Sequence, residues 1–335
     1  MHMRGSIAEV EKGVIQWYPI HKSIQKTHVI EDQAMKYVVS SSFVFCLGFA
    51  GPLAAQTAQD GFYTNGYAEL SYFDVAGSSN TFGYSEATIG FVDPRSGFGA
   101  EFGVDALITE DDDEAAIYGA ATYQSSFGKL SFGVPRAALD AYFASVPTVG
   151  GMLAFKIGQI GAAKRSFLST RYLFSDGKVP IGLRYDGTFG TTNIGASYHR
   201  FDDLDVYNLA ANHQFGPTLV MGGLEHVKDT TLSETRYFLG AETKLGQVSA
   251  GLLYSGNFDF SDDAAIEAYA KYKPLEQLEL AATALNLDTG SGPDTLFGLS
   301  ADYSFNQGGY VKAGIADDFN TGNSTAYNLA LGLRF

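Results

Sequence analysis

The last ten residues of the chain, 326–335, alternate between apolar and polar positions. Tyr327, Leu329, Leu331, Leu333 and Phe335 are large and apolar, and the residues between them are small or polar. Because successive side chains of a β-strand point to opposite faces, this segment is expected to be a strand with one apolar and one polar face. Ten residues are about the length that a tilted strand needs to cross a bilayer. The pattern therefore predicts a membrane-spanning strand that ends on an aromatic residue.

The same period of two recurs along nearly the whole chain from residue 62 and predicts sixteen strands. Their ranges are 62–73, 81–92, 97–108, 115–125, 129–135, 180–189, 193–201, 206–215, 219–228, 235–245, 247–257, 265–273, 277–288, 295–305, 309–318 and 326–335. One face of each strand is apolar, while the other face carries charges such as Glu86 and Arg184. A sheet in lipid must close on itself because an open edge leaves backbone groups unpaired, and a barrel of this size encloses water. We therefore expect an all-β fold, a sixteen-stranded antiparallel transmembrane β-barrel, and not a soluble β-sandwich that would bury these charges.

The composition of the chain agrees with such a barrel. Of its 335 residues 45% are hydrophobic and 18% are charged, and it contains 20 Tyr, 25 Phe and 39 Gly. Aromatic and glycine residues in this abundance, at a mean hydropathy of -0.03, suit a barrel that is apolar outside and polar inside. The net charge of -15 excludes a basic surface for nucleic acid.

The connections between the predicted strands alternate between two kinds. One kind is short, as at 126–128 and 190–192, and the other is longer and acidic, as at 110–114 and 202–205. In an up-and-down barrel alternate connections lie at opposite ends, so short periplasmic turns and longer external loops are expected. In the first acidic loop, Asp111, Asp113 and Glu114 are candidate Ca²⁺ ligands that could bridge lipopolysaccharide phosphates or subunits; the alternative is a solvated acidic loop.

The N-terminal segment resembles a secretory leader. Residues 35–55 join a positive start at Lys36 to an apolar run and to the small residues Ala54 and Ala55, which predicts a signal peptide. Residues 1–34 are then a non-structural extension preceding a start at Met35, or else a genuine extended leader. The mature barrel would span 56–335 and contain no cysteine, because Cys46 lies in the predicted leader.

One long segment, 136–179, breaks the alternation between the fifth and sixth predicted strands. Its charges are mostly positive, so it should be attracted to the acidic inner wall. Folded into the lumen, it would set the width and selectivity of a channel; alternatively, it caps the outside or contacts a neighbouring subunit. The candidate constriction residues are Glu69, Glu86, Glu101, Asp105, Arg136, Asp140, Lys156, Lys164, Arg165, Arg171 and Arg184.

Several segments together resemble the general bacterial porin family, most of all the Rhodobacter-type trimeric porins of alphaproteobacteria. These segments are 66–70, 126–133, 136–140, 183–186 with 193–198, and the terminal Phe335. The resemblance implies a homotrimer in the outer membrane of a Gram-negative bacterium, in contact with lipid and lipopolysaccharide. It also implies a third loop folded into each pore, where charged clusters face each other across an eyelet. The residues themselves predict no enzymatic activity and no cofactor apart from the candidate Ca²⁺ at the acidic loops. Phe335 resembles the signal that the barrel-assembly machinery reads.

The chain departs from the family pattern in its charges. Glu86 stands where the family has an arginine on the second strand, Arg136 is displaced by Val134 and Pro135, and the third loop is basic instead of acidic. We expect a water-filled channel for passive diffusion of ions and small hydrophilic solutes, with a weak preference for cations. The alternatives are a substrate-specific channel and a plugged structural barrel.

An enzyme is not expected from the residue spacing. Ser197 and His199 share one face of a predicted strand, with Asp186 on its neighbour. Residues i and i+2 of one strand lie about 7 Å apart, beyond the reach of a direct hydrogen bond between a nucleophile and its base.

Overall fold

The structure is a computed structural model that describes residues 61–75, 77–109, 113–143, 145–156, 161, 163–175, 177–258, 263–289, 292–318 and 325–335. The predicted extension 1–34, the predicted signal peptide 35–55 and the candidate calcium ligand Asp111 lie outside these residues. Within the described part of the chain, no helix is long and apolar enough to cross a membrane.

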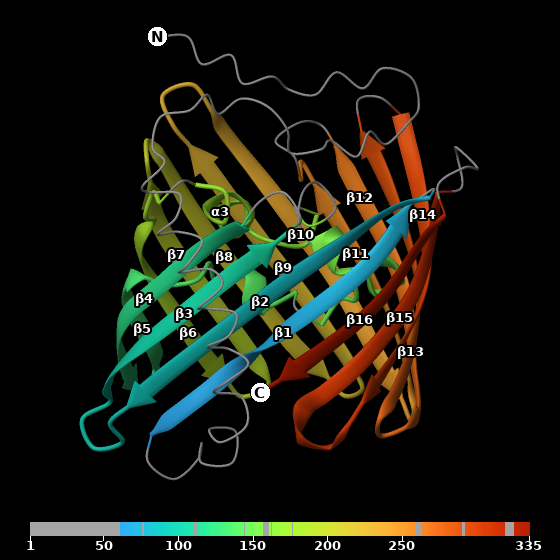
Figure 1. Ribbon diagram of the computed structural model, residues 1–335. Coiled ribbons are helices and arrows are strands. Elements are labelled where there is room, and N and C mark those ends of the chain that lie inside the picture. Colours follow the sequence, from blue (N-terminus) through green and yellow to red (C-terminus); the bar gives the residue numbers. More distant parts are fainter. Residues whose placement is uncertain are drawn as a thin grey trace.

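Sixteen antiparallel strands follow one another around a closed barrel (Figure 1). They are β1 (Phe62–Val75), β2 (Ser78–Val92), β3 (Phe98–Ile108), β4 (Asp113–Ser125), β5 (Gly128–Val134), β6 (Ile181–Phe189), β7 (Thr192–Phe201), β8 (Leu204–Phe215), β9 (Thr218–Lys228), β10 (Ser233–Leu245), β11 (Val248–Gly256), β12 (Ala264–Leu275), β13 (Leu278–Thr289), β14 (Gly292–Ser304), β15 (Gly309–Asp318) and β16 (Ala326–Arg334). The predicted barrel and its strand number are confirmed.

The first and last strands close the barrel. β1 pairs with β16 in a register that sets Tyr67 opposite Arg334. Phe335 extends this pairing beyond β16, because Gly66 N donates to Phe335 O at 3.0 Å and Phe335 N donates to Gly66 O at 3.1 Å. A Cβ on Gly66 would overlap the carbonyl oxygen of Glu86 on β2, so the close approach of β1 to β2 needs a glycine at this position.

The outward face of the barrel is apolar. Large side chains on many strands are half exposed or more, among them Leu70, Phe98, Phe102, Phe132, Leu183, Leu239, Leu299 and Leu331. A continuous apolar surface of this extent is unfavourable in water and is what a barrel presents to lipid. The alternation of the sequence thus places these residues as predicted.

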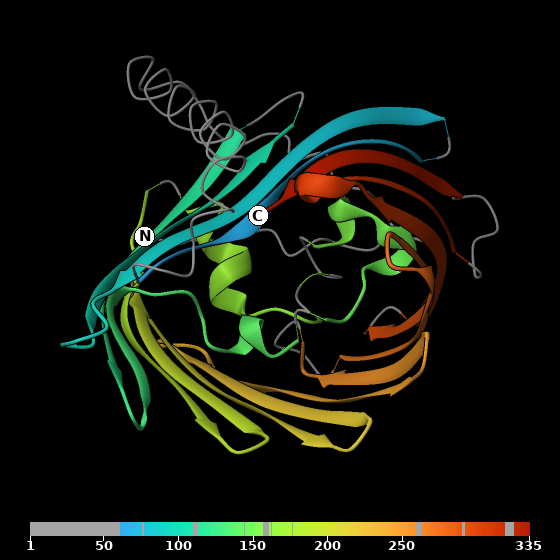
Figure 2. The ribbon, with the colours of Figure 1, turned by 90° about the horizontal axis from the view of Figure 1, so that it is seen from below.

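The long segment between β5 and β6 lies inside the ring of strands, as the view along the barrel shows (Figure 2). It contains three 3₁₀ helices, η1 (Leu139–Ala141), η2 (Val149–Gly151) and η3 (Leu153–Lys156), and the short helix α3 (Phe167–Tyr172). β5 ends early, with Val134 opposite Gly119 of β4. Beyond that point Tyr172 of α3 donates its hydroxyl to the carbonyl of Ile117 on β4, at 2.6 Å.

The inner face of the wall is less polar than its sequence pattern indicates. Three apolar clusters join the loop to the wall, and loop residues such as Leu139, Val149 and Leu168 are fully buried in them. Their wall partners include Leu107, Phe201, Val206, Met221, Phe238, Leu285 and Leu296. Alternation alone does not predict this contribution, because it reveals which residues share a face but not which of them meet an apolar loop.

Candidate pore constriction

Two carboxylates of the inner wall lie side by side opposite the loop. Glu86 of β2 and Asp105 of β3 are cross-strand partners. Lys156 Nζ lies 2.7 Å from Glu86 Oε2, Arg136 Nη1 lies 2.6 Å from Asp105 Oδ1, and Arg165 Nη2 lies 3.9 Å from Glu86 Oε2. Two adjacent carboxylates repel each other, and the three loop cations compensate their negative charges. We call these five residues the constriction cluster; two negative and three positive groups leave it a formal charge of +1.

Arg136 is held from several sides although it is displaced along the sequence. Its guanidinium lies 4.2 Å from the centre of the Tyr118 ring and donates to Ala87 O at 3.1 Å. A planar group with several donors can stack on a ring and bind a carboxylate at once. Arg184 of β6 also donates to Arg136 O at 3.3 Å, so the start of the loop is tied to the wall.

Lys156 reaches the wall between two tyrosines. Its Nζ lies 4.6 Å from the centre of the Tyr67 ring and 5.2 Å from that of Tyr84, and it donates to the Tyr67 hydroxyl. Removal from water lowers the pKa of Lys156, and the attraction of Glu86 opposes this effect.

Lys164 binds a different part of the wall. Its Nζ lies 2.6 Å from Glu267 Oε2 on β12 and donates to Pro147 O at 2.6 Å, and its burial lowers its pKa. Asp140 accepts a hydrogen bond from Ser166 N at 2.6 Å, which links two parts of the same loop. The structure therefore separates Lys164 from the constriction cluster, whereas Asp140 lies close enough to Arg165 to attract it.

The other candidate residues pair within the wall. Glu69 binds Lys312 at 2.6 Å, and Glu101 binds Lys129. Arg184 binds Asp186, with Nη2 2.7 Å from Oδ1. These pairs place charges of both signs on the lumen side, and their carboxylates are paired with cations of the wall instead of cations of the loop.

Arg171 lies on α3 with its side chain exposed, and the structure does not bring it to the constriction cluster. The eleven candidates are thus distributed over several ion pairs and do not form one ring.

Two wall residues outside that candidate set anchor the loop. Glu225 and Arg236 are cross-strand partners on β9 and β10, and they form an ion pair with both side chains fully buried. Glu225 also accepts hydrogen bonds from the Ser166 hydroxyl and from Phe167 N, the latter at 3.0 Å. Opposite charges at matching positions of two adjacent predicted strands were a signal that could have identified this pair.

The loop reaches the far side of the barrel through a close backbone contact. Gly150 of η2 has a φ of +58°, and its amide donates to Thr283 Oγ1 at 3.3 Å. A Cβ on Gly298 or Gly314 would overlap the backbone of Gly150. Glycines on β14 and β15 therefore create the space into which the loop fits, and the loop bridges the lumen from β2–β3 to β13–β15.

No catalytic or metal-binding geometry emerges among the described residues. Ser197 Oγ accepts a hydrogen bond from Ala138 N at 3.0 Å, and His199 Nε2 lies 2.8 Å from Pro135 O, so both hold the loop. Asp113 and Glu114 begin β4, and within the described ranges no three His, Cys, Asp or Glu side chains gather as a metal site. Calcium binding with Asp111 stays a prediction.

A closed antiparallel barrel with an apolar exterior and a charged loop across its lumen defines a channel-type protein of the outer membrane. The chain belongs to the Gram-negative porin family, whose model matches residues 41–323. This membership places the protein in the outer membrane of Gram-negative bacteria, among channels and not enzymes. No curated protein sequence matches the chain.

Solved porin structures share the fold at low sequence identity. A mutant of the Rh. blastica porin is 16% identical with a TM-score of 0.63, covering 82% of this chain and 100% of that one. A porin refined at 1.8 Å resolution is 20% identical, with a TM-score of 0.58 and coverages of 82% and 100%. OmpT of Vibrio cholerae lacking loop L8 is 14% identical, with a TM-score of 0.60 and coverages of 82% and 99%.

Proposed function

We propose that the protein is a passive diffusion channel for ions and small hydrophilic solutes, with a weak preference for cations. The observation that carries this proposal is the constriction cluster, in which loop cations Arg136, Lys156 and Arg165 face wall carboxylates Glu86 and Asp105. Opposed fixed charges across a narrow passage orient water and disfavour large or apolar solutes.

The direction of the ion preference follows from two opposing fields. The constriction cluster carries a formal +1, which favours anions locally. The chain as a whole carries -15, and acidic residues such as Asp202, Asp203 and Asp317 lie at the end of the barrel from which the long loop starts, the first two in the short turn between β7 and β8. A charged mouth raises the local concentration of counter-ions, so a weak net preference for cations is proposed.

The proposed assembly is a homotrimer in contact with outer-membrane lipid and lipopolysaccharide, inserted by the barrel-assembly machinery. The similarity to Rhodobacter-type trimeric porins noted in the sequence supports it. The molar mass of the detergent-solubilised protein, measured by light scattering with the detergent contribution subtracted, tests it. A mass of one chain would contradict the proposal.

A plugged structural barrel is the second candidate. It is favoured by the three apolar clusters through which the loop packs on the wall nearly all the way around the lumen. A substrate-specific channel is the third candidate, and it would show saturable flux.

Single-channel recording of purified 56–335, refolded and inserted into planar bilayers, separates these candidates. A diffusion channel gives stepwise currents that rise linearly with salt concentration. A plugged barrel gives none, although it still shows the shifted gel mobility of a folded barrel. A zero-current potential of the anion-selective sign would contradict the proposed cation preference.

A further inference from the structure

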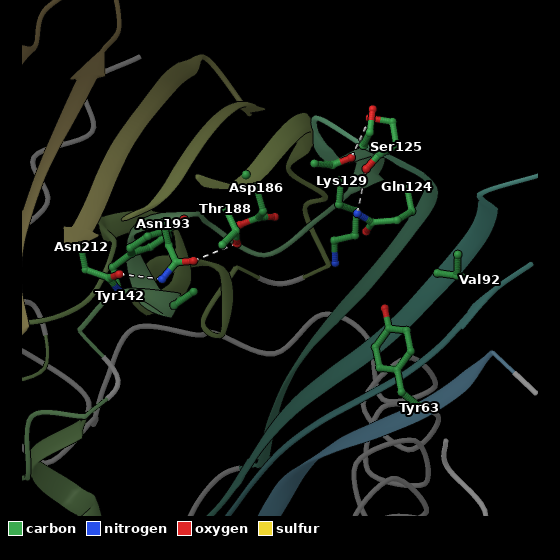
Figure 3. Close-up of a pocket in the computed structure, with 14 residues that line it drawn as sticks. Tyr63, Val92, Gln124, Ser125, Lys129, Tyr142, Asp186, Thr188, Asn193 and Asn212 are labelled. Atoms are coloured by element: carbon green, nitrogen blue, oxygen red, sulfur yellow. Dashed lines mark hydrogen bonds between the residues drawn. The ribbon is translucent and has the colours of Figure 1, made fainter. Parts of the chain in front are cut away.

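A second polar feature of the lumen lies apart from the constriction cluster. A cavity of 580 Å³ opens between η1 and the wall, near the short turn that joins β4 to β5. Its lining comes from β1, β2, β4, β5, β6, β7 and β8 together with Ala141 and Tyr142 of the loop (Figure 3). None of its lining residues belongs to the constriction cluster. Its volume falls in the range of sites that hold small molecules.

One wall of the cavity carries a fixed chain of hydroxyl and amide groups. Thr188 Oγ1 donates to Asn193 Oδ1 at 2.8 Å, and Asn193 Nδ2 donates to Asn212 Oδ1 at 2.8 Å (Figure 3). Each of these amide oxygens has a second lone pair, and the amide nitrogen of Asn212 has two N–H donors of its own. The chain therefore offers donors and acceptors in orientations that are set before a solute arrives.

Two tyrosines contribute ring surface to the lining: the hydroxyl of Tyr63 already donates to Glu101, and Tyr142 presents only the exposed edge of a largely buried ring. Tyr63 lies over Gly90 and Tyr142 lies over Gly195, and a Cβ on either glycine would overlap the ring above it. The glycines therefore fix where each ring lies. Burial raises the pKa of Tyr142 to about 12, so its hydroxyl remains a neutral donor near pH 7.

The charges of the cavity cancel. Lys129 and Asp186 are cross-strand partners on β5 and β6, and each has its own counter-ion. Lys129 binds Glu101, and Asp186 binds Arg184 at 2.7 Å. Four charges of alternating sign give the site no net attraction for an anion or a cation. A zwitterion would have to compete with ion pairs that are already formed.

We propose that this cavity binds a small, neutral, polyhydroxylated solute, that is, a sugar. The hydroxyls of such a molecule match the Thr188–Asn193–Asn212 chain, and its C–H faces match the rings of Tyr63 and Tyr142. The inference deepens the proposed channel function by assigning it a preferred class of solute. Affinity in the millimolar range is expected, because the site is open and buries only part of a ligand.

The test combines isothermal titration calorimetry of the refolded protein with single-channel recording. Glucose is the probe, and gluconate and glycine betaine are the charged and zwitterionic controls. Glucose should bind saturably and reduce the current in a concentration-dependent way. The double variant Asn193→Leu with Asn212→Leu should lose at least tenfold in affinity. The matched control is Asn328→Leu, an inward-facing asparagine on β16 that does not line the cavity.

The outcomes separate this inference from the channel function. A conducting protein that shows no heat of glucose binding, or binds gluconate or betaine more tightly, overturns the sugar site and leaves the channel intact. A protein that binds glucose without conducting overturns the channel and leaves the site. Gel mobility identifies folded barrels, and if the double variant misfolds, Tyr142→Ala replaces it, with the same tenfold loss expected. Unchanged affinity in a folded variant contradicts the assignment.

Discussion

Glu225 of β9 and Arg236 of β10 form an ion pair that is fully shielded from solvent, and the loop is tied to both residues. Phe167 N donates to Glu225, while Arg236 donates to Arg165 O at 2.9 Å and to Phe258 O at 2.7 Å. The pair therefore joins the wall to the loop segment that carries Arg165 into the constriction cluster.

Replacing Arg236 with Met should destabilise the barrel and loosen the loop. Glu225 would be left as a buried charge without its partner, at a cost of about 3–5 kcal/mol. The urea midpoint of unfolding and the noise of the open channel measure the two effects. Lys273→Met is the control, because Lys273 pairs with Glu279 through side chains of which 57% and 33% are exposed. Equal midpoints for the two variants would contradict an anchoring role.

Replacing Lys156 with Gln should increase the preference for cations. The constriction cluster would change from a formal +1 to zero while Glu86 keeps its charge. At about 10 Å in water one unit charge changes the energy of an ion by about 0.4 kcal/mol. This is about a twofold effect on each ion and about fourfold on the permeability ratio. Zero-current potentials in a KCl gradient measure it, and a shift toward anions would be the opposite of the expected result.

Raising the pH should also increase the preference of the channel for cations. Burial lowers the pKa values of Lys156 and Lys164, so both lose their protons at a lower pH than an exposed lysine does. Loss of positive charge leaves Glu267 without its cation and Glu86 with Arg165 as its remaining partner, and cations are then favoured. Zero-current potentials at pH 7 and pH 10 check this. The Lys156→Gln channel should show a smaller change, and an equal change would assign the titration to other groups.

Deleting part of residues 140–165 should raise the single-channel conductance. This segment contains η2 and η3 and bridges the lumen from Lys156 to Gly150, so its removal opens the space between β2 and β14. The shifted gel mobility of a folded barrel serves as the control for folding. Unchanged conductance in a folded variant would mean that this segment does not limit the pore.

Deleting Phe335 should lower the yield of folded barrel more than the conductance of each channel. Its backbone makes the two hydrogen bonds to Gly66 that extend the β1–β16 seam. Its side chain packs against Ala68, Ala87 and Val104, on the outer face of the wall and not in the lumen. The folded fraction after refolding and the single-channel current measure the two properties separately. Phe305→Ala, which removes an exposed aromatic next to a short turn, is the matched control.

The alternation of the sequence was sufficient to predict the barrel. In a strand, the side chain of Leu331 must point to the same face of the sheet as those of Leu329 and Leu333. This local rule repeats sixteen times, with short and long connections in turn. In lipid, every strand can be paired on both sides only if such a sheet closes on itself. Neither the strand number nor the lipid-facing residues required knowledge of distant contacts.

The contacts of the loop were decided by tertiary structure alone. The charges of segment 136–179 and of the inner wall predicted that a basic loop would meet an acidic wall. They did not predict that Lys156 would bind Glu86 and Arg136 would bind Asp105, or that Lys164 would bind Glu267. Those pairings depend on the path of a chain without a repeating pattern, set by glycine contacts and apolar packing against the wall. The cavity beneath η1 has the same origin, because strands distant in sequence enclose it together with the loop.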